Sequence, residues 1–295
     1  MQWMELSLNV SPTKAAKAAE ILGKYGQGGA EVEEWESEDS CEYYSIIKIY
    51  LPLNRKYKDI QSQILKEIAV LDNKMILKEK RLKQDEWFDS LRKGFKVFEI
   101  GSKIIIKPSW VETAYIPKGK VVIELDPGAA FGTGLHATTR LMLLNIEKYL
   151  KKRMNVFDLG TGTGILAIAS VKLGASKVLA YDYDPVAVKA ARFNLEVNLV
   201  DSSVQIRRGT LSRTAQLKFK NAFDLVLANI TSRAISDMSG GLAKILKPGG
   251  YLIVSGIHPQ GLDEVLIRLA LADLKLVDLQ QEDLWSAVIA KKPKA

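Results

Sequence analysis

The chain has 295 residues, 47% of them hydrophobic and 26% charged, and this composition excludes a disordered or fibrous protein. Lys and Arg number 42 against 34 Asp and Glu, and the net charge of +8 either attracts anionic partners such as RNA or only solvates the surface. One cysteine and two histidines rule out an intrachain disulfide and argue against a metal site. Without a signal-like leader or an apolar run of membrane-spanning length, we expect a cytoplasmic protein that binds no metal.

The N-terminal part of the chain predicts a small α+β domain. Ser11 and Pro12 form a good N-cap and N1 pair for a first helix, and apolar residues at helical spacing mark a second helix over 57–71. Strands are predicted over 2–9, 30–35, 43–50 and 75–79. The order βαββαβ is that of a ferredoxin-like domain, which we place at residues 1–80.

Residues 81–95 are polar and charged, and they predict a linker helix. Trp87, Phe88 and Leu91 lie at helical spacing within it. Because such stripes usually pack against a neighbour, we interpret these side chains as packing residues rather than a ligand site. The hydrophobic pattern changes near residue 95, so the second domain is placed at 96–295.

The second domain alternates apolar strands with helix-length segments, a pattern typical of a doubly wound parallel sheet in an α/β fold. Short strands at 97–100 and 103–107 precede the main ones. The main strands are predicted over 121–125, 155–159, 177–181, 204–207, 225–228 and 251–255. Two final strands, 274–279 and 285–290, are joined by a short polar turn, so we expect the last strand to run antiparallel to the others.

A glycine-rich turn follows the strand that ends at Leu159. Gly160, Gly162 and Gly164 would let the backbone approach a nucleotide closely, because glycine has no Cβ. A dinucleotide fingerprint would need a further glycine at the position of Ile165. A nicotinamide-dependent dehydrogenase is therefore the second hypothesis, and the antiparallel ending of the sheet also argues against it.

Two carboxylates accompany this turn. Asp158, directly before it, would repel a pyrophosphate but suits a ligand with an amino group and a sulfonium cation, both of which S-adenosylmethionine carries. Asp182, at the end of the next strand, can accept hydrogen bonds from both hydroxyls of a ribose. Its alternative role as a helix cap is better filled by Asp184, which precedes Pro185. We predict S-adenosylmethionine as the cofactor, held by Asp158, Asp182 and the glycine turn.

The segment 126–140 predicts a loop that covers the ligand. Its glycines and small residues give it conformational freedom, and an apolar Phe131 among them would otherwise be poorly buried. Phe131, Gly132 and Thr133 are therefore assigned to the cofactor site, against the alternative of an ordinary tight loop. His136 precedes a helix, so we expect it to cap or pack and assign it no catalytic role.

The fourth strand of the parallel sheet ends with Ala228, Asn229 and Ile230. At the carboxyl edge of an open sheet Asn229 would face the ligand crevice, where its amide oxygen can orient an amine by accepting an N–H. Asn229 is the predicted catalytic residue. It can also serve as the N-cap of the following helix, and the two roles are compatible.

Taken together, these segments resemble the ribosomal protein L-eleven methyltransferase (PrmA) family over essentially the whole chain. The most specific matches are Leu125–Gly128, Ala130–Gly134 and His136–Thr139, supported by Ala228–Ile230. Thr161 and Thr163 stand where that family more often has Cys and Ser.

The resemblance implies a class I methyltransferase fold, a Rossmann-like doubly wound sheet with an antiparallel last strand, behind a domain that recognises a ribosomal protein. It implies cofactor contacts at Thr139, Gly160, Asp182 and Asn229. It also implies trimethylation of lysine ε-amines and of the N-terminal α-amine of large-subunit ribosomal protein L-eleven, either free or on the ribosome. We expect a monomer with a weak contact to ribosomal RNA and no membrane partner.

Three other functions stay open at this point. An RNA or nucleobase methyltransferase would share the cofactor site, although Asn229 and Ile230 are not followed by the proline and aromatic residue common in amino-methylating nucleic-acid enzymes. A lysine methyltransferase for another protein would differ mainly in residues 1–80. A non-catalytic ribosome-binding module would bind the cofactor without transferring its methyl group.

Overall fold

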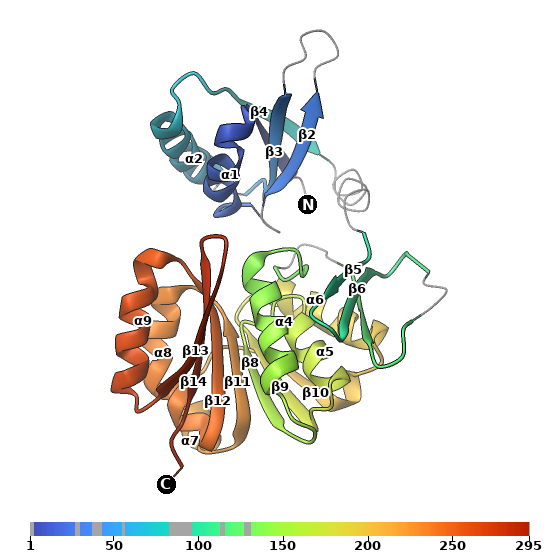
Figure 1. The fold of residues 1–295 in the computed structure, drawn as a ribbon, viewed down its shortest axis with the longest axis vertical. Coiled ribbons are helices and arrows are strands. Elements are labelled where there is room, and N and C mark those ends of the chain that lie inside the picture. Colours follow the sequence, from blue (N-terminus) through green and yellow to red (C-terminus); the bar gives the residue numbers. More distant parts are fainter. Residues whose placement is uncertain are drawn as a thin grey trace. The chain divides into compact units, whose positions relative to one another are not determined.

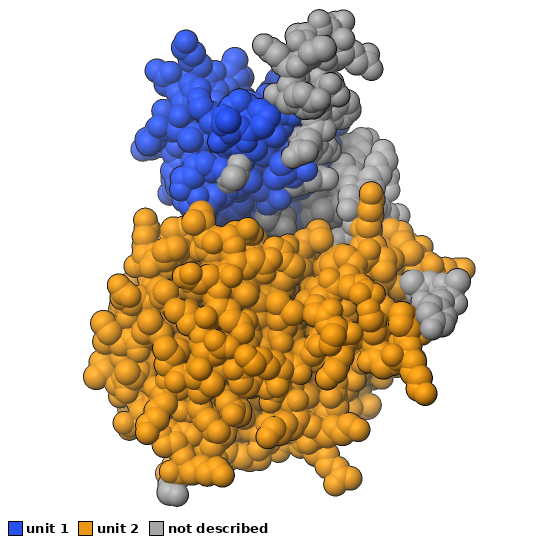
Figure 2. All heavy atoms as spheres, in the orientation of Figure 1, with its two compact units in different colours: residues 1–95 blue, residues 96–295 orange. Residues whose placement is uncertain are grey.

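The computed structural model describes residues 3–26, 30–36, 43–54, 57–82, 96–112, 116–126 and 131–294. The chain divides into two compact units, residues 1–95 and 96–295, which are coloured separately in Figure 2. Each unit has a hydrophobic core of its own. Among the described residues, no helix has both the length and the apolar character needed to cross a membrane.

The smaller unit is a four-stranded antiparallel sheet with two helices (Figure 1). Its elements are β1 (Trp3–Val10), α1 (Pro12–Gly23), β2 (Glu31–Glu36), β3 (Tyr43–Pro52), α2 (Tyr57–Leu71) and β4 (Leu77–Leu82). The strand order β2-β3-β1-β4 and the chain order βαββαβ give the predicted ferredoxin-like arrangement.

The core of this unit follows from two sequence periods. Alternate residues of β1, among them Leu6 and Leu8, point to one face and are buried. Ile64 and Ile68 lie one turn apart on α2 and pack into the same cluster. Burying one such side chain stabilises the fold by about 1.5–3 kcal/mol, so this helix face and strand face hold each other in place.

Two details at the edges of this unit differ from the predictions. The first helix begins at Pro12 as predicted, but the hydroxyl of Ser11 makes no capping hydrogen bond to it. Arg81 and Leu82, which we assigned to the linker helix, belong to β4. The rest of the predicted linker, residues 83–95 with Trp87, Phe88 and Leu91, lies outside the described residues.

The larger unit contains a seven-stranded sheet in the order β10-β9-β8-β11-β12-β14-β13. Its strands are β8 (Asn155–Leu159), β9 (Lys177–Asp182), β10 (Val204–Arg208), β11 (Phe223–Asn229), β12 (Leu246–Ile257), β13 (Lys275–Glu282) and β14 (Trp285–Lys291). Strands β8 to β12 pair in parallel, whereas β14 is antiparallel to both of its neighbours, which confirms the prediction for the last strand.

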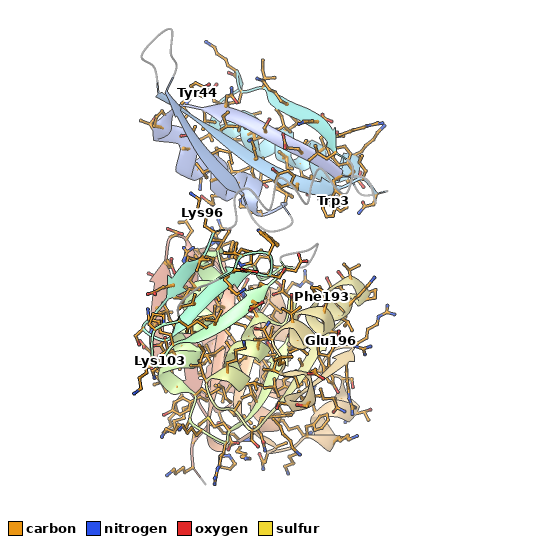
Figure 3. The ribbon with its side chains drawn as sticks, turned by 90° about the vertical axis from the view of Figure 1, so that its right-hand side faces the viewer. Trp3, Tyr44, Lys96, Lys103, Phe193 and Glu196 are labelled. Atoms are coloured by element: carbon orange, nitrogen blue, oxygen red, sulfur yellow. The ribbon has the colours of Figure 1, made fainter. Side chains whose placement is uncertain are left out.

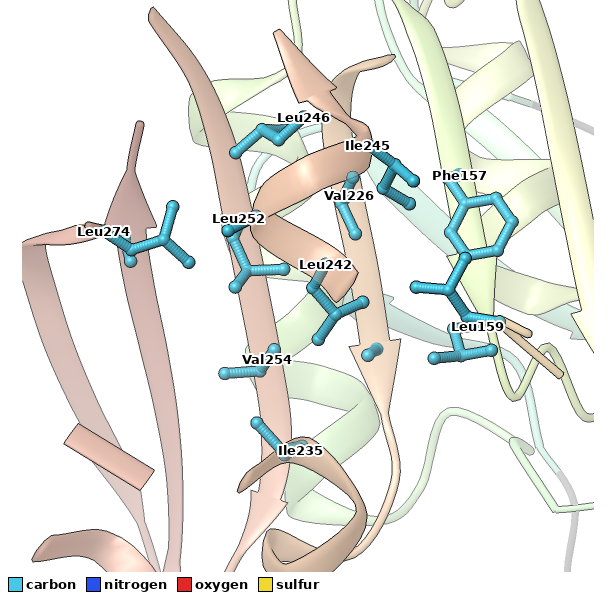
Figure 4. Close-up of a cluster of buried hydrophobic side chains, with 14 of the residues drawn as sticks. Phe157, Leu159, Val226, Ile235, Leu242, Ile245, Leu246, Leu252, Val254 and Leu274 are labelled. Atoms are coloured by element: carbon cyan, nitrogen blue, oxygen red, sulfur yellow. The ribbon is translucent and has the colours of Figure 1, made fainter. Parts of the chain in front are cut away.

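Helices connect these strands on both faces of the sheet. They are α4 (Ala137–Tyr149), α5 (Ile165–Lys172), α6 (Pro185–Val197), α7 (Arg213–Lys218), α8 (Ser232–Ile245) and α9 (Pro259–Leu271), with a short η1 (Asp201–Ser203). The core of this unit joins α8 and α9 to alternate strand residues such as Phe157 and Leu159, and Figure 4 shows the part that packs on α8. Asp158, between those two, therefore points to the opposite face, in keeping with the period of two.

A smaller three-stranded sheet precedes the large one. Strands β5 (Phe98–Ile100) and β6 (Ile104–Pro108) pair antiparallel, and β6 pairs in parallel with β7 (Val121–Leu125). The chain leaves β7 through the segment predicted to cover a ligand and enters α4. In the large sheet, the strand order reverses between β8 and β11, because the chain runs outwards from β8 through β9 to β10 and then returns to the other side of β8 as β11. Open sheets bind ligands beyond the carboxyl ends of their strands at such a switch point.

Candidate active site

The glycine turn lies at this switch point, between β8 and α5. Gly160, Gly162 and Gly164 all have positive φ, at 74°, 56° and 85°. A Cβ on Gly162 would collide with the carbonyl oxygen of Phe131, and one on Gly160 would lie 2.5 Å from a methyl carbon of Ile230. Both the backbone conformation and the lack of space thus require glycine, and the turn forms a bare backbone surface.

Asp158 is completely buried at the base of the turn. The hydroxyl of Thr161 donates a hydrogen bond to its Oδ2 at 2.6 Å. Burial raises the pKa of Asp158 to about 7, the Thr161 hydrogen bond opposes this rise, and the charge of Asp182 adds to it. Among the described residues, no Lys or Arg forms an ion pair with this carboxyl group. The site therefore favours a cationic ligand group nearby.

Asp182 is the last residue of β9 and is buried beside the turn. Its Oδ2 accepts the backbone N–H of Gly162 at 2.9 Å, and its Oδ1 accepts that of Asp184 at 3.0 Å. Asp184 caps α6 by accepting from Val186 N, as predicted from the sequence. Each oxygen of Asp182 keeps a further lone pair, so it can still accept a ligand hydroxyl.

The described part of the covering loop packs on the glycine turn. Thr163 donates its backbone N–H to Phe131 O at 2.9 Å and its hydroxyl to Gly132 O at 2.6 Å. Gly132 and Thr133 are buried, whereas the side chain of Phe131 is 43% exposed. Residues 127–130 lie outside the described residues. The loop thus lies against the turn, and its covering of a ligand stays a prediction.

Four rings form an aromatic row near the start of β14. Phe131 and His136 have centroids 5.4 Å apart, His136 and Trp285 5.2 Å, and Trp285 and His258 6.0 Å, all edge to face. The Nδ1 of His136 accepts the backbone N–H of Thr138 and caps α4, as predicted. Burial and the charge of Arg140 lower the pKa of His136 while Asp283 raises it, so its ring is an uncharged member of the row.

Arg140 connects this region to the turn between β13 and β14. Its Nε donates to Glu282 Oε1 at 2.6 Å, and its Nη1 donates to the carbonyl oxygen of Leu135. The loop before α4 is thereby tied to the hairpin that carries Trp285. The sequence reasoning missed Arg140, because its partner lies 142 positions away along the chain.

Thr139 lies in the first turn of α4 and is completely buried. Within the described part of the chain, its hydroxyl oxygen has no hydrogen-bond partner. Leaving such a group unsatisfied costs about 1–3 kcal/mol. The orphaned hydroxyl is therefore consistent with a residue that binds a ligand.

Asn229 ends β11 next to the glycine turn. The register pairs Ala228 with Leu159, so Asn229 lies alongside Gly160, and its side chain is half-buried. The helix that follows, α8, is capped by the hydroxyl of Thr231, which accepts from Ala234 N. The alternative role of Asn229 as N-cap is therefore wrong, and its amide is not used for that purpose.

These residues fit S-adenosylmethionine. The glycine turn offers backbone that a Cβ would block, Asp182 offers acceptors at the end of β9, and Thr139 has an unused hydroxyl. The buried carboxyl group of Asp158 complements a cationic ligand. With the strand order and reversed last strand, this site defines a class I S-adenosylmethionine-dependent methyltransferase.

Comparison with known proteins narrows this class. The family model for ribosomal protein L11 methyltransferase (PrmA) matches residues 2–293. A ribosomal protein L11 methyltransferase of Herpetosiphon aurantiacus is 35% identical over 99% of this chain and 100% of its own length. A second, of Chloroflexus aurantiacus, is 34% identical over 99% and 98%. The chain belongs to the ribosomal protein L11 methyltransferase family and is an S-adenosylmethionine-dependent protein methyltransferase.

A solved structure supports the same assignment. The ribosomal protein L11 methylase of Lactobacillus delbrueckii subsp. bulgaricus is 33% identical, with a TM-score of 0.62. The similarity covers 68% of this chain and 100% of that one. The class I fold and the cofactor predicted from the sequence are thereby confirmed.

Proposed function

We propose that this enzyme trimethylates lysine ε-amines and the N-terminal α-amine of the large-subunit ribosomal protein L11. The observation that carries the substrate is the full-length similarity, at 33–35% identity, to relatives named for that protein. The similarity includes the ferredoxin-like unit, to which we assign substrate recognition. We further propose that it acts as a cytoplasmic monomer on free or ribosome-bound substrate, with a weak contact to ribosomal RNA.

The cofactor contacts form part of this proposal. We assign the glycine turn with Gly160 and Gly162, the carboxylates Asp158 and Asp182, and the hydroxyl of Thr139 to holding S-adenosylmethionine. Phe131, Gly132 and Thr133 lie against the same turn and are assigned to its cover. When bound, the cofactor supplies a methyl group activated by the positive charge of its sulfonium.

Asn229 is assigned to positioning the acceptor amine. Its amide oxygen can accept an N–H of the amine and direct the nitrogen lone pair along the line of transfer. The aromatic row is assigned to excluding water and to stabilising a methylated ammonium through its ring faces. Methyl transfer of this type depends mainly on orientation, which a half-buried amide at a strand end can provide.

No dedicated acid or base is assigned. A lysine ε-amine has a pKa of about 10.4 in water, and burial beside a sulfonium cation would lower it, whereas an α-amine near 7.7 needs little help. His136, which lies in the covering loop, is a candidate base, but its Nδ1 already accepts the backbone N–H of Thr138 as the cap of α4. Solvent is therefore the expected proton acceptor.

Radiolabelled methyl transfer to purified ribosomal proteins tests the proposal directly. We expect the label in L11, and mass spectrometry of the labelled band should show trimethylated lysine and a trimethylated N-terminus. An L11 variant with arginine in place of lysine and a blocked N-terminus is the matched control, and it should accept no label. Label in RNA, or in a different ribosomal protein, would contradict the substrate assignment.

A further inference from the structure

Asn194 of α6 and Asn198, the C-cap residue of the same helix, lie one helical turn apart and are both buried. Their neighbours Phe193 and Glu196, labelled in Figure 3, are exposed on the outer side of the same helix. Because the other residues of the inner face are apolar, two primary amides there need hydrogen-bond partners. Each amide finds them on the main chain at the end of β7.

Each asparagine bonds to the backbone of one residue there. Asn198 accepts Glu124 N at 2.9 Å and donates to Glu124 O at 2.6 Å. Asn194 accepts Asp126 N at 3.0 Å and donates to Asp126 O at 3.5 Å. A side-chain amide carries the same donor and acceptor as a peptide group. The two side chains thus bond to the end of β7 as a neighbouring strand would.

Asn194 makes one contact that Asn198 does not. Its Nδ2 also donates to the backbone carbonyl of Thr163, in the glycine turn, at 2.9 Å. Thr163 in turn bonds to Phe131 O and Gly132 O through its own N–H and hydroxyl. Asp126 on one side of the loop and Phe131 on the other are therefore connected through two completely buried residues. We call Asn194 and Thr163 the clasp.

We propose that the clasp positions the cofactor site: Asn194 and Thr163 hold the glycine turn in its binding conformation and fix Phe131 at the entrance. The part concerning Phe131 rests on the role proposed for it above. The clasp also bears on Gly162, the residue before Thr163, whose N–H donates to the Asp182 carboxylate. A turn held at Thr163 presents this N–H and the Asp182 carboxylate in a fixed relation.

A matched pair of variants tests the clasp. In Asn194→Asp the acceptor for Asp126 N is kept, but a carboxylate replaces the donor and faces the carbonyl oxygens of Thr163 and Asp126. Asn198→Asp makes the same chemical change one turn away, where the carbonyls belong to Glu124 and Asn194. Both variants carry the same net charge and both disturb the α6–β7 contact. Only the first breaks the bond to the glycine turn.

Two measurements on the full-length protein decide between positioning and mere stability. Calorimetry with S-adenosylmethionine should show affinity about tenfold weaker in Asn194→Asp, the loss of one buried hydrogen bond, and within about twofold of wild type in Asn198→Asp. Amide hydrogen exchange without cofactor should be faster at residues 160–164 in the first variant only. Equal affinities in the two variants would overturn the proposal, and neither measurement depends on which protein is methylated.

Thr163 provides a second test if Asn194→Asp does not fold. Thr163→Val removes only the hydroxyl bond to Gly132 O, and Thr163→Ser keeps it. We expect weaker cofactor affinity and a higher KM for the protein substrate in the valine variant, both restored by serine. Cofactor affinity in Thr163→Val equal to that of wild type would also overturn the role of the clasp.

Discussion

The glycine turn and the aromatic row are both proposed parts of the active site, but their residues are brought together in different ways. The turn is continuous in sequence, from Asp158 to Gly164, and its shape is fixed by backbone angles that only glycine adopts readily. The row takes its rings from Phe131, His136, His258 and Trp285, which are brought together by α4, α9 and β14. The shape of the turn thus depends on local backbone geometry, and the shape of the row depends on tertiary assembly.

Substitution in the turn should have the largest effect. Gly162→Ala combines a positive φ with a collision between Cβ and the Phe131 carbonyl, so we expect cofactor affinity to fall by about a hundredfold or more. Gly119→Ala is the control, since Gly119 also has positive φ, at 90°, but meets nothing within 4 Å. Calorimetric affinities for both variants measure the collision separately from backbone strain. A similar loss of cofactor affinity in both variants would show that it does not arise from the Cβ in the turn.

Asn229 lies beside the glycine turn and is proposed to orient the acceptor amine, so its replacement should separate binding from transfer. Asn229→Ala removes the amide proposed to orient the amine, and we expect turnover to fall by about fiftyfold while cofactor affinity changes less than about threefold. The test is a pair of measurements: kcat for methyl transfer to L11, and the dissociation constant of S-adenosylmethionine. Unchanged turnover would remove Asn229 from the mechanism.

The aromatic row should respond in a smaller and different way. Phe131→Ala deletes the ring at one end of the row, and because Phe131 is also assigned to the cover of the cofactor, we expect cofactor affinity to fall and KM for the protein substrate to rise, each by about tenfold. Leu135→Ala controls for loss of an exposed apolar side chain in the same loop, because the two are 43% and 46% exposed. Unchanged cofactor affinity in Phe131→Ala would remove Phe131 from the cofactor site.

The same contrast explains how much could be predicted from the sequence. The bounds of α2, β7 and β8 match the prediction, because each carries a clear hydrophobic period between turn residues. β12 is longer than predicted, beginning at Leu246, because Pro248 and Gly249 in it read as a break between elements. β4 extends to Leu82 through charged residues that are exposed, as expected of an edge strand, and these resemble a linker in sequence.

Within the site, local motifs were predictable and long-range contacts were not. The glycine turn, Asp182 and the capping role of His136 follow from neighbours within a few positions. Asn194 gave no signal, because an asparagine inside an amphipathic helix resembles an ordinary polar residue until its partners on β7 are known. The capping of α8 by Thr231 instead of Asn229 was a choice between two good cap residues two positions apart, which sequence preference alone does not resolve.

The last prediction concerns stability rather than binding or turnover, and it tests the carboxyl group at the base of the turn. Burial raises the pKa of Asp158 to about 7 from its ordinary value of 3.8, so the folded state favours the protonated form. The stabilisation from this group is complete below about pH 4 and is lost as the pH rises towards 7, with a range on the order of 4 kcal/mol. Asp158→Asn removes this dependence while keeping an acceptor for Thr161.

We therefore expect the melting temperature of Asp158→Asn, relative to wild type and without cofactor, to increase from pH 4 to pH 7 and then level off. The full gain is about 10 °C, because a change of 1 kcal/mol shifts the midpoint by about 2–4 °C in a domain of this size. Asp201→Asn, which removes a negative charge from an exposed position, is the control. A difference in melting temperature that does not vary with pH would mean that Asp158 is already ionised in the enzyme without cofactor. Its negative charge would then be present before the cationic cofactor binds.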